Sequence, residues 1–432
     1  MTYTEAVQYI HSVTWKGSVP GLSRITELCE SIGNPQDSLS FVHIAGTNGK
    51  GSFCSMLSSV LTEAGYTVGL FTSPFVKEFN ERFRVNGENI SDDELAEVTE
   101  FVKPRADKMT DSPTEFELIT AIAFEYFKRK KCDIVVLEVG MGGRLDSTNI
   151  IKTPVLSVIT EISLDHTAFL GSTVEAIARE KSGIIKNGTP VLFSGTDEVA
   201  AKTVAEEAKK RSSRCFAVDY STLCVKNADI HGSTFDFNGN KDYRISLAGE
   251  YQPRNAAAVI SAVEILRAEG WQISDSALRI GLEKTKWHAR FELLSEDPVI
   301  IYDGGHNPDG VRVTFKSARL CFSRKPILLT GIMADKNYKE VADIASEYAY
   351  RVYTVKPNVP RALDAQSYAD VYSERGVCAF AAASVEQGVC DAVTAASEEH
   401  RPLLIFGSLY MYADVSAAVE KFLSRTKEKY DK

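Results

Sequence analysis

The sequence predicts an α/β protein built from two domains, and three observations carry this prediction. The chain has 432 residues, which is too long for one ordinary hydrophobic core. Short apolar segments alternate with helical patterns, an order that is typical of parallel sheets covered on both faces. A glycine-rich loop within VHIAGTNGKGS, residues 42–52, joins an apolar segment to a helical pattern. Strand, glycine loop and helix in this order are the usual setting of a phosphate-binding loop.

The elements of the first domain follow from hydrophobic periodicity. Residues 40–46 (SFVHIAG) form a short apolar run that predicts a buried strand. Residues 53–61 repeat apolar side chains at helical spacing, and Gly65 stands where a helix C-terminal cap is expected. A second helical pattern covers residues 115–130. Three further apolar runs predict buried strands at residues 133–139 (DIVVLEV), 154–160 (PVLSVIT) and 190–193 (PVLF).

The segment from about residue 212 to residue 248 has a different character. Its pieces FAVDY, TFDFNG and DYRISLAG are rich in β-forming residues and are broken by Gly, Asn and Asp, which predicts hairpins. A helix is expected to resume at Asn255. A new α/β run follows with VIIYDGG, PILLTGIM, RVYTV and LLIFGS. Charges and a proline interrupt the pattern at residues 292–298, so we expect domains at 1–295 and 296–432.

Composition excludes several classes of protein. The chain is 44% hydrophobic and 25% charged, its formal net charge is −9, and no apolar run is long enough to span a bilayer. We therefore expect no membrane partner and no broad nucleic-acid binding. The N-terminus lacks the pattern of a signal peptide. The 8 cysteines show no metal-like spacing, which predicts reduced, mostly buried thiols in a cytoplasmic protein.

The glycine-rich loop is the first candidate site. Gly46, Gly49 and Gly51 allow the backbone to come close to phosphate oxygens, and Lys50 places a positive charge beside them. The loop departs from the strict phosphate-loop pattern because Ile44 stands where Gly is expected and Gly51 where Ser or Thr is expected. Ser52 can supply that hydroxyl one residue later. The alternative is a plain strand-to-helix turn with an exposed lysine.

Two polar residues follow predicted strands in the same way and are candidate ligands of magnesium. Glu138 ends a strongly apolar strand, where an unpaired carboxylate is costly to bury. His166, in SLDHTAFLG, follows the next strand. The carboxyl ends of strands in open α/β sheets border the ligand crevice. Glu138, His166 and a hydroxyl such as that of Ser73 make a sufficient set for Mg²⁺. The alternatives are a buried ion pair for Glu138 and a structural role for His166.

Three other stretches are less decisive. Lys181 lies in AREKSGIIKNG among charged neighbours, and its spacing predicts a solvated helix face. Asp303, His306 and Asn307 cluster on the glycine-rich turn of YDGGHNPDG, where the alternatives are a ligand site and a hydrogen-bonded turn. Arg290, in WHARF, is a candidate for nucleotide binding, with a salt bridge as the alternative.

Together these motifs resemble the folylpolyglutamate synthase and dihydrofolate synthase family of the Mur ligase superfamily. The matching blocks stand in the family's order over essentially the whole chain. They are GTNGKGS, TSPF with FNERFRVNG, LEVGMGGRLDSTN, SLDHTAFLG, REKSGIIK, GEYQPRNAA, WHARFE, YDGGHNP and GIMADKN.

The resemblance implies a phosphate-loop (P-loop) ligase domain with a parallel sheet and a small β-rich insert, followed by a smaller Rossmann-like α/β C-terminal domain. It implies ATP-dependent addition of L-glutamate to a folate carboxylate through an acyl phosphate, with release of ADP and phosphate. We expect action on tetrahydrofolate and also on dihydropteroate. We also expect two Mg²⁺ sites, carbamylation of Lys181 and a monomeric protein.

The resemblance also assigns roles to individual residues. ATP binding is implied for Gly46, Thr47, Asn48, Gly49, Lys50, Gly51, Ser52, Asn255, Arg290 and Asp303. The implied metal ligands are Ser52, Ser73, Glu138, His166 and Lys181. Substrate binding is implied for Arg144, Asp146, His306 and Ser408, and catalytic roles for Lys50, Lys181 and His306.

Three other functions are weighed against this one. A Mur-type cell-wall ligase shares the chemistry but carries a further N-terminal domain, whereas only about 40 residues precede the loop here. A P-loop switch protein requires base-recognition and switch motifs, which the sequence lacks. A small-molecule kinase makes a stable phosphoester instead of releasing phosphate.

Overall fold

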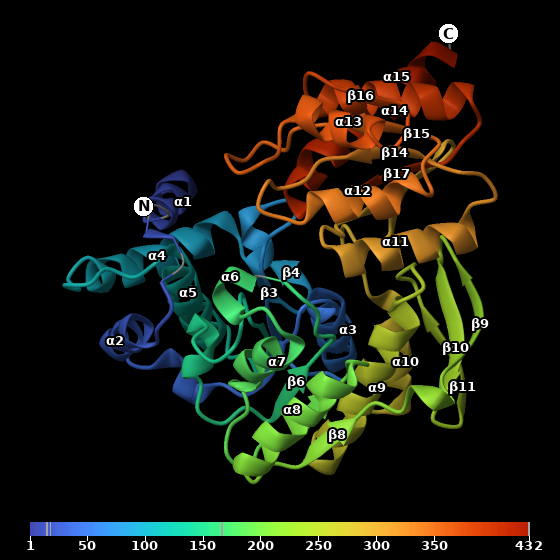
Figure 1. Cartoon of the computed structure of the whole chain (residues 1–432). Helices are drawn as coiled ribbons and strands as arrows, with labels where there is room; N and C mark the ends of the chain where they lie inside the picture. Colours follow the sequence, from blue (N-terminus) through green and yellow to red (C-terminus); the bar gives the residue numbers. More distant parts are fainter. Residues whose placement is uncertain (14–15, 18, 166, 431–432) are drawn as a thin grey trace. The chain divides into compact units, whose positions relative to one another are not determined.

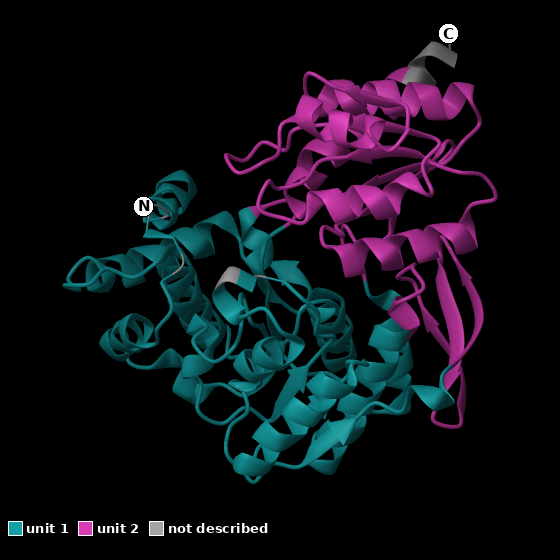
Figure 2. Ribbon diagram, viewed as in Figure 1, with its two compact units in different colours: residues 1–75, 79–223, 254–285 teal, residues 76–78, 224–253, 286–432 magenta. Residues whose placement is uncertain are grey.

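The computed structural model describes residues 1–13, 16–17, 19–165 and 167–430, and it divides into two compact units. Unit 1 comprises residues 1–75, 79–223 and 254–285. Unit 2 comprises residues 76–78, 224–253 and 286–432 (Figures 1 and 2). The chain therefore passes more than once between the two units, and each unit has its own sheet.

Unit 1 is built on an eight-stranded sheet with the order β4-β3-β2-β5-β1-β6-β7-β8. The six strands from β2 to β8 in this order are parallel, while β3 and β4 join antiparallel at one edge. The strands predicted at residues 40–46, 133–139, 154–160 and 190–193 are confirmed. Their observed bounds, with those of the other strands, are β1 Phe41–Ala45, β2 Val68–Phe71, β3 Phe83–Val85, β4 Glu88–Asn89, β5 Ile134–Glu138, β6 Leu156–Ile159, β7 Val191–Phe193 and β8 Cys215–Ala217.

Helices cover both faces of this sheet, as the sequence predicted. Phe41, Val135 and Leu137 pack under α5, and α7 and α8 cover the neighbouring strands on the same face. Helix α3 packs on β1, β2 and β5 and is itself packed against α10. The helices are α1 Tyr3–His11, α2 Ser23–Ser31, α3 Lys50–Glu63, α4 Asp92–Ala106, α5 Glu115–Arg129, α6 Thr167–Leu170, α7 Val174–Ser182, α8 Glu198–Lys210, α9 Gln252–Ala268 and α10 Asp275–Lys284.

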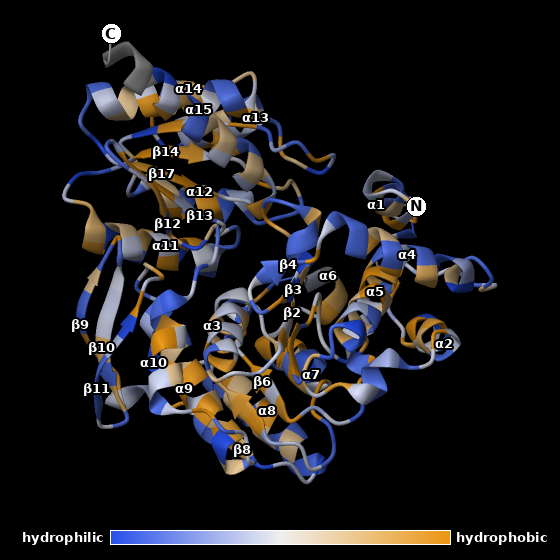
Figure 3. Cartoon of the chain, turned by 180° about the vertical axis from the view of Figure 1, so that it is seen from behind, coloured by the Kyte–Doolittle hydropathy of each residue, from blue (hydrophilic) through white to orange (hydrophobic). Residues whose placement is uncertain are grey.

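Unit 2 contains a six-stranded sheet with the order β12-β13-β17-β14-β15-β16. Only the β12–β13 pair is antiparallel. Helices α11, α12 and α13 pack on one face, and α14 and α15 on the other. The bounds are β12 Glu292–Glu296, β13 Val299–Asp303, α11 Pro308–Cys321, β14 Ile327–Thr330, α12 Tyr338–Ser346, β15 Arg351–Thr354, α13 Ala365–Ser373, β16 Ala379–Ala381, α14 Val385–Glu398, β17 Leu403–Phe406 and α15 Tyr412–Tyr430. The apolar strands β14 and β17 stand out in the hydropathy colouring (Figure 3).

The β-rich segment forms a separate antiparallel sheet of β9 (Cys224–Asp229), β10 (Gly232–Phe237) and β11 (Asn240–Ile245). This confirms the hairpins predicted around TFDFNG and DYRISLAG. The first piece, FAVDY, is different: its strand β8 pairs in parallel with β7 and completes the sheet of unit 1. The sequence of a short apolar strand does not specify which sheet it joins, because its pairing partner is distant in the chain.

The division of the chain differs from the boundary expected at residues 295 and 296. Strand β12 precedes that boundary but pairs with β13 in the sheet of unit 2, so residues 286–295 group with the second unit. The β-rich segment also groups with unit 2. The Pro298 that suggested a boundary lies in the turn of the β12–β13 hairpin.

The structure also bears on the expected lack of membrane-spanning segments and on the expected burial of the cysteines. No helix within the described residues is long and apolar enough to cross a membrane. The eight cysteines are free thiols, but the expectation that most are buried is wrong, because Cys215, Cys224 and Cys378 are exposed and two others are half-buried.

The close packing of α3 on α10 gives a prediction about stability. Gly281 of α10 lies so near α3 that an added Cβ would stand 2.4 Å from the Val60 Cα and 2.7 Å from the Val60 nitrogen. Glycine-to-alanine changes inside helices normally stabilise by about 1 kcal/mol. Gly281→Ala should instead lower the free energy of unfolding by about 1–3 kcal/mol, measured by urea denaturation. Ser276→Ala, at an exposed position of the same helix, should change it by less than about 0.5 kcal/mol.

Candidate active site

The glycine-rich loop connects β1 to α3, as predicted, and two of its glycines are required by its geometry. Gly46 has φ +153°, and an added Cβ would lie 1.8 Å from the Thr160 hydroxyl oxygen. Gly49 is the N-cap of α3 with φ +87°, and its Cβ would lie 2.9 Å from the Asn255 side-chain oxygen. Asn255 therefore touches the loop, although its sequence position is about 200 residues away. Only a residue without a side chain fits at either position.

The loop is held in place by the residues that follow β6. The Thr47 and Asn48 N–H groups donate to the Glu161 carbonyl at 2.7 and 3.3 Å. The Thr160 hydroxyl donates to the Asn48 carbonyl at 2.8 Å, and the Thr47 hydroxyl to the Ser163 carbonyl at 3.1 Å. The loop is thus preorganised by protein contacts. Thr160 was missed in the sequence, although it stands at the carboxyl end of a strand just as Glu138 does.

Lys50 is the first residue of α3, and its side chain turns back over the loop. Its Nζ donates to the Gly46 carbonyl at 3.1 Å and the Thr47 carbonyl at 3.3 Å. The alternative of an exposed lysine in a plain turn does not hold, because the side chain is only 17% exposed. Ser52 is fully buried in the first turn of the same helix.

Glu138 ends β5, beside the loop, because β5 pairs with β1 through Ile44. Its side chain is buried, its Oε2 accepts the Ser73 N–H at 3.1 Å, and its Oε1 lies 3.9 Å from the Lys50 Nζ. The alternative of an ion pair is therefore present, but it is long. Glu138 with the hydroxyls of Ser73 and Ser52 gives hard oxygen donors, the type that Mg²⁺ prefers.

These donors are compatible with a magnesium ion, although they are not a preformed cage. Among the described residues, no group of three or more His, Cys, Asp or Glu side chains is arranged to hold a metal. This suits Mg²⁺, which usually takes few protein ligands and keeps waters and phosphate oxygens. His166, the predicted histidine ligand, lies outside the described residues.

Lys181 corrects the prediction made from its spacing. It does not lie on a solvated face: the residue is 5% exposed, and its Nζ donates to the Gly46 carbonyl at 2.8 Å. Burial, together with the positive charge of Lys50, lowers the pKa of Lys181 to about 7. The charged neighbours in sequence do point outward, as Arg179 pairs with Glu175 and Glu207. Only the fold reveals that the opposite side of α7 faces the loop.

The two lysines line a small cavity of about 30 Å³. Its other lining residues are Gly46, Thr47, the turn from Val139 to Gly142, and Asp165. Asp165 is a further residue that sequence reasoning missed, although it directly precedes the predicted ligand His166. A small, polar cavity that contains two lysine side chains beside a phosphate-type loop is suited to an anionic group.

The segment after β5 contains Arg144 and Asp146, which were predicted to bind substrate. Asp146 is buried, and its carboxylate accepts the Met141 N–H at 2.9 Å and the Thr148 N–H and hydroxyl at 3.0 and 2.6 Å. Burial raises the pKa of the Asp146 carboxyl group. Arg144 is exposed and pairs with Glu180 at 2.9 Å. The geometry gives Asp146 a role in holding the turn, and substrate contact by either residue stays a prediction.

Asp303 ends β13 in unit 2, and protein donors surround it. Its Oδ1 accepts the Gly305 N–H at 2.8 Å and the Thr314 hydroxyl at 2.7 Å. Its Oδ2 accepts the Tyr251 hydroxyl at 2.8 Å and the Phe291 N–H at 2.9 Å. The alternative of a hydrogen-bonded turn is therefore present, and nucleotide contact by Asp303 stays a prediction.

Other predicted residues of unit 2 lie near the ends of β13 and β17. The Nδ1 of His306 contacts the Gly304 carbonyl at 2.9 Å. Ser408 is buried, and its hydroxyl accepts the Tyr410 N–H at 3.1 Å. Within the described residues Arg290 forms no ion pair, and its Nη1 donates to the Ala289 carbonyl at 3.3 Å. The salt bridge considered for Arg290 is thus not observed.

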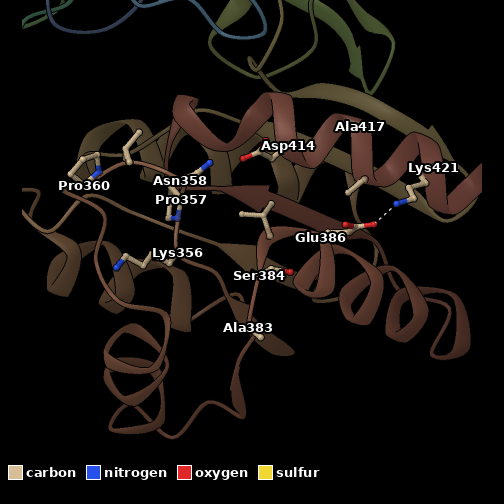
Figure 4. Close-up of a pocket in the computed structure, with 13 residues that line it drawn as sticks. Lys356, Pro357, Asn358, Pro360, Ala383, Ser384, Glu386, Asp414, Ala417 and Lys421 are labelled. Carbon is tan, nitrogen blue, oxygen red and sulfur yellow. Dashed lines mark hydrogen bonds and ion pairs between the residues drawn. The ribbon is translucent and has the colours of Figure 1, made fainter. Parts of the chain in front are cut away.

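Unit 2 also contains a larger cavity, of about 840 Å³, between the segment after β15 and helices α14 and α15 (Figure 4). Two of its charged side chains form an ion pair, in which the Lys421 Nζ lies 2.6 Å from the Glu386 Oε1. None of the site residues predicted from the sequence is among those that line it. The charge arrangement around the loop of unit 1 is therefore the stronger candidate for an active site.

Two known domain families match the chain. Residues 44–263 match the Mur ligase middle domain, and residues 289–409 match the Mur ligase glutamate ligase domain. The first match begins at the glycine-rich loop, and the second includes Arg290, Asp303 and His306. Together they span most of the chain.

Individual relatives match over nearly their full length. The chain is 36% identical to the folylpolyglutamate synthase of Lacticaseibacillus casei, over 96% of this chain and 98% of that protein. It is 37% identical to the dihydrofolate synthase/folylpolyglutamate synthase of Bacillus subtilis, with the same coverage. The structure is also similar to a solved structure described as an FPGS–AMPPCP–folate complex, where FPGS stands for folylpolyglutamate synthase. The TM-score is 0.82 and the sequence identity 34%, over 98% of this chain and 99% of that one. The chain belongs to the folylpolyglutamate synthase and dihydrofolate synthase family of Mur ligases and is an ATP-dependent ligase.

Proposed function

We propose that this ligase joins L-glutamate to the carboxylate of a folate, acting on tetrahydrofolate and also converting dihydropteroate to dihydrofolate. The observation that carries the proposal is the meeting of Lys50, Lys181 and Glu138 around the glycine loop, in a chain whose relatives carry these enzyme names. The reaction proceeds by attack of the folate carboxylate on the γ-phosphate of ATP. The amine of glutamate then attacks the acyl phosphate, and ADP and phosphate are released.

The first step brings an anionic carboxylate toward a polyanionic nucleotide, so positive charge is its main requirement. The N–H groups of the first turn of α3 cradle the phosphates, because those of Thr47 and Asn48 already donate to the Glu161 carbonyl. The Lys50 ammonium, held by the Gly46 and Thr47 carbonyls, lies where it can neutralise them. Its long ion pair with Glu138 leaves it available to a closer anion.

The proposed metal ligands come from the end of β5, the segment after β2 and helices α3 and α7, together with His166. Ser73, Glu138 and His166, with Ser52, would hold one Mg²⁺, and a carbamylated Lys181 would supply a ligand for a second. Bound magnesium supplies charge neutralisation and alignment of the phosphates during transfer. Carbamylation needs a neutral amine, and a Lys181 pKa of about 7 supplies one near neutral pH.

The remaining predicted residues are assigned as follows. Asn255, Arg290 and Asp303 bind the nucleotide. His306 and Ser408 bind or steer glutamate. Arg144 and Asp146 shape the folate site. The free thiols of the chain support a reducing compartment, and we propose the cytoplasm.

Lys50→Ala should lower kcat for glutamate ligation by at least about 10²-fold, because a charge that stabilises phosphoryl transfer is removed. The fold should be retained, as judged by circular dichroism. Lys128→Ala, at an exposed lysine of α5, is the matched control and should leave turnover unchanged. Normal turnover in folded Lys50→Ala would rule out this site.

Phosphate release should require ATP, glutamate and a folate substrate together, with either dihydropteroate or tetrahydrofolate serving. A colorimetric phosphate assay that omits each component in turn measures this dependence. Release without glutamate would favour a switch-type nucleotide hydrolase. Activity with only one of the two folates would remove the dual specificity but leave the ligase.

Lys181→Ala should lose most activity and regain part of it with added short carboxylates such as acetate, which replace the anionic carbamate. Lys186→Ala is a matched control. Lys186 is a half-buried lysine whose pKa is also lowered by burial, to about 8, but its Nζ donates to the Asn149 carbonyl and not to the glycine loop. Acetate should not restore any activity lost in Lys186→Ala. Full activity of Lys181→Ala without acetate would eliminate the carbamate.

A further inference from the structure

Arg290 stands between two residues in a backbone conformation that side chains disfavour. Ala289 has φ +58° and Phe291 has φ +50°, and both are fully buried. Left-handed backbone is uncommon for residues other than glycine, and it is a marked outlier for a bulky residue such as phenylalanine. Such residues are strained and persist where their surroundings enforce them. One such residue lies on each side of Arg290, so specific contacts must stabilise this backbone.

A carboxylate enforces each of the two conformations. The Ala289 N–H donates to the Glu292 Oε2 at 2.7 Å, and the Phe291 N–H donates to the Asp303 Oδ2 at 2.9 Å. Hydrogen bonds from backbone N–H groups to ionised carboxylates are about twice as strong as neutral ones. The two bonds are therefore of the right size to offset the local strain.

Glu292 is itself fixed by two further side chains. Its Oε1 accepts the Nδ1–H of His288 at 2.8 Å and the hydroxyl of Tyr412 at 3.0 Å. The rings of His288 and Tyr412 lie 5.5 Å apart, and Tyr412 also makes an edge contact with buried Tyr302. Glu292 thus ties the segment before β12 to the start of α15. Neither of its oxygens bonds to Arg290.

The backbone on both sides of Arg290 is therefore held by hydrogen bonds, while no ion pair with a described residue neutralises its guanidinium charge. The Arg290 Nη1 reaches back to the Ala289 carbonyl, which also accepts the Gly304 N–H at 2.8 Å. A Cβ at Gly304 would lie 2.7 Å from that Nη1, so the arginine passes directly over a glycine. Within the described residues the Arg290 guanidinium forms no ion pair with a carboxylate, and its Nη1 bonds the Ala289 carbonyl. Both nearby carboxylates are used to hold its backbone.

We propose that Glu292, held by His288 and Tyr412, is a positioning residue that aims Arg290 at an anionic group of the bound nucleotide. This inference rests on the proposed role of Arg290 in nucleotide binding. Glu292 acts through the backbone of Ala289, so its loss misdirects the arginine without removing any group that contacts ATP.

A double-mutant cycle tests the proposal, with ATP varied at saturating glutamate and folate. Arg290→Ala should raise the KM for ATP about tenfold or more, as expected for loss of a charge-assisted hydrogen bond. Glu292→Gln should raise the same KM several-fold while kcat changes less than about twofold. In the Arg290→Ala background, Glu292→Gln should add nothing. Glu296→Gln, at an exposed glutamate of the same strand, is the matched control.

Two results would overturn the positioning role. One is an unchanged KM in Glu292→Gln, with or without a fall in thermal stability. The other is that the effects of Glu292→Gln and Arg290→Ala simply add. If Arg290→Ala itself leaves the KM unchanged, the nucleotide role of Arg290 has failed, and the positioning role falls for that separate reason.

Two milder variants guard against misfolding of Glu292→Gln. Tyr412→Phe keeps the ring packing and removes one donor to Glu292, so it should raise the KM for ATP by a smaller factor. Ala289→Gly keeps the backbone bond to Glu292 and adopts the left-handed conformation without strain, so it should leave the KM for ATP unchanged and keep or raise the melting temperature. An unchanged KM in Tyr412→Phe would also contradict the proposal.

Discussion

Two lysine ammonium groups donate to one carbonyl oxygen, that of Gly46, and the site of unit 1 is organised around this shared contact. Like charges that meet in a buried place repel one another, and the lowered pKa of Lys181 reflects both its burial and the charge of Lys50. The ion pair between Glu138 and Lys50 spans 3.9 Å, and Asp165 adds a second negative charge beside Lys181. Under the proposed function, the triphosphate supplies further negative charge to the two lysines.

The sheet topology explains why residues so distant in sequence meet there. Strand β1 lies between β5 and β6, and all three are parallel. Their carboxyl ends therefore deliver the glycine loop, Glu138 and Thr160 to one edge. The crossover helix α7 then places Lys181 under the Gly46 carbonyl. In unit 2 the same logic gathers Asp303 and Ser408 at the ends of β13 and β17, which are also paired in parallel.

The sequence alone was sufficient for the architecture and for residues whose local setting is unusual. Lys50 was recognisable from its glycines, and Glu138 from being a carboxylate in an apolar strand. Lys181 was not recognisable from its spacing, because its environment is made by a carbonyl 135 positions earlier. Only the family resemblance marked it. The pairing of β8 with β7 and the grouping of residues 286–295 with unit 2 differ from the sequence-based expectation for a similar reason, because pairing partners decide both. The left-handed residues beside Arg290 had no signal at all, as neither is glycine.

The contact between Gly46 and Thr160 has a consequence for inhibitor design. With the Thr160 hydroxyl oxygen 1.8 Å from where a Cβ would stand, no substitution at position 46 is compatible with this loop. A compound that bonds only to the backbone of Gly46 and Thr47 would meet a surface that point mutations cannot remodel without destroying the enzyme. Contacts to exposed side chains such as Arg144 would offer no such protection against drug resistance.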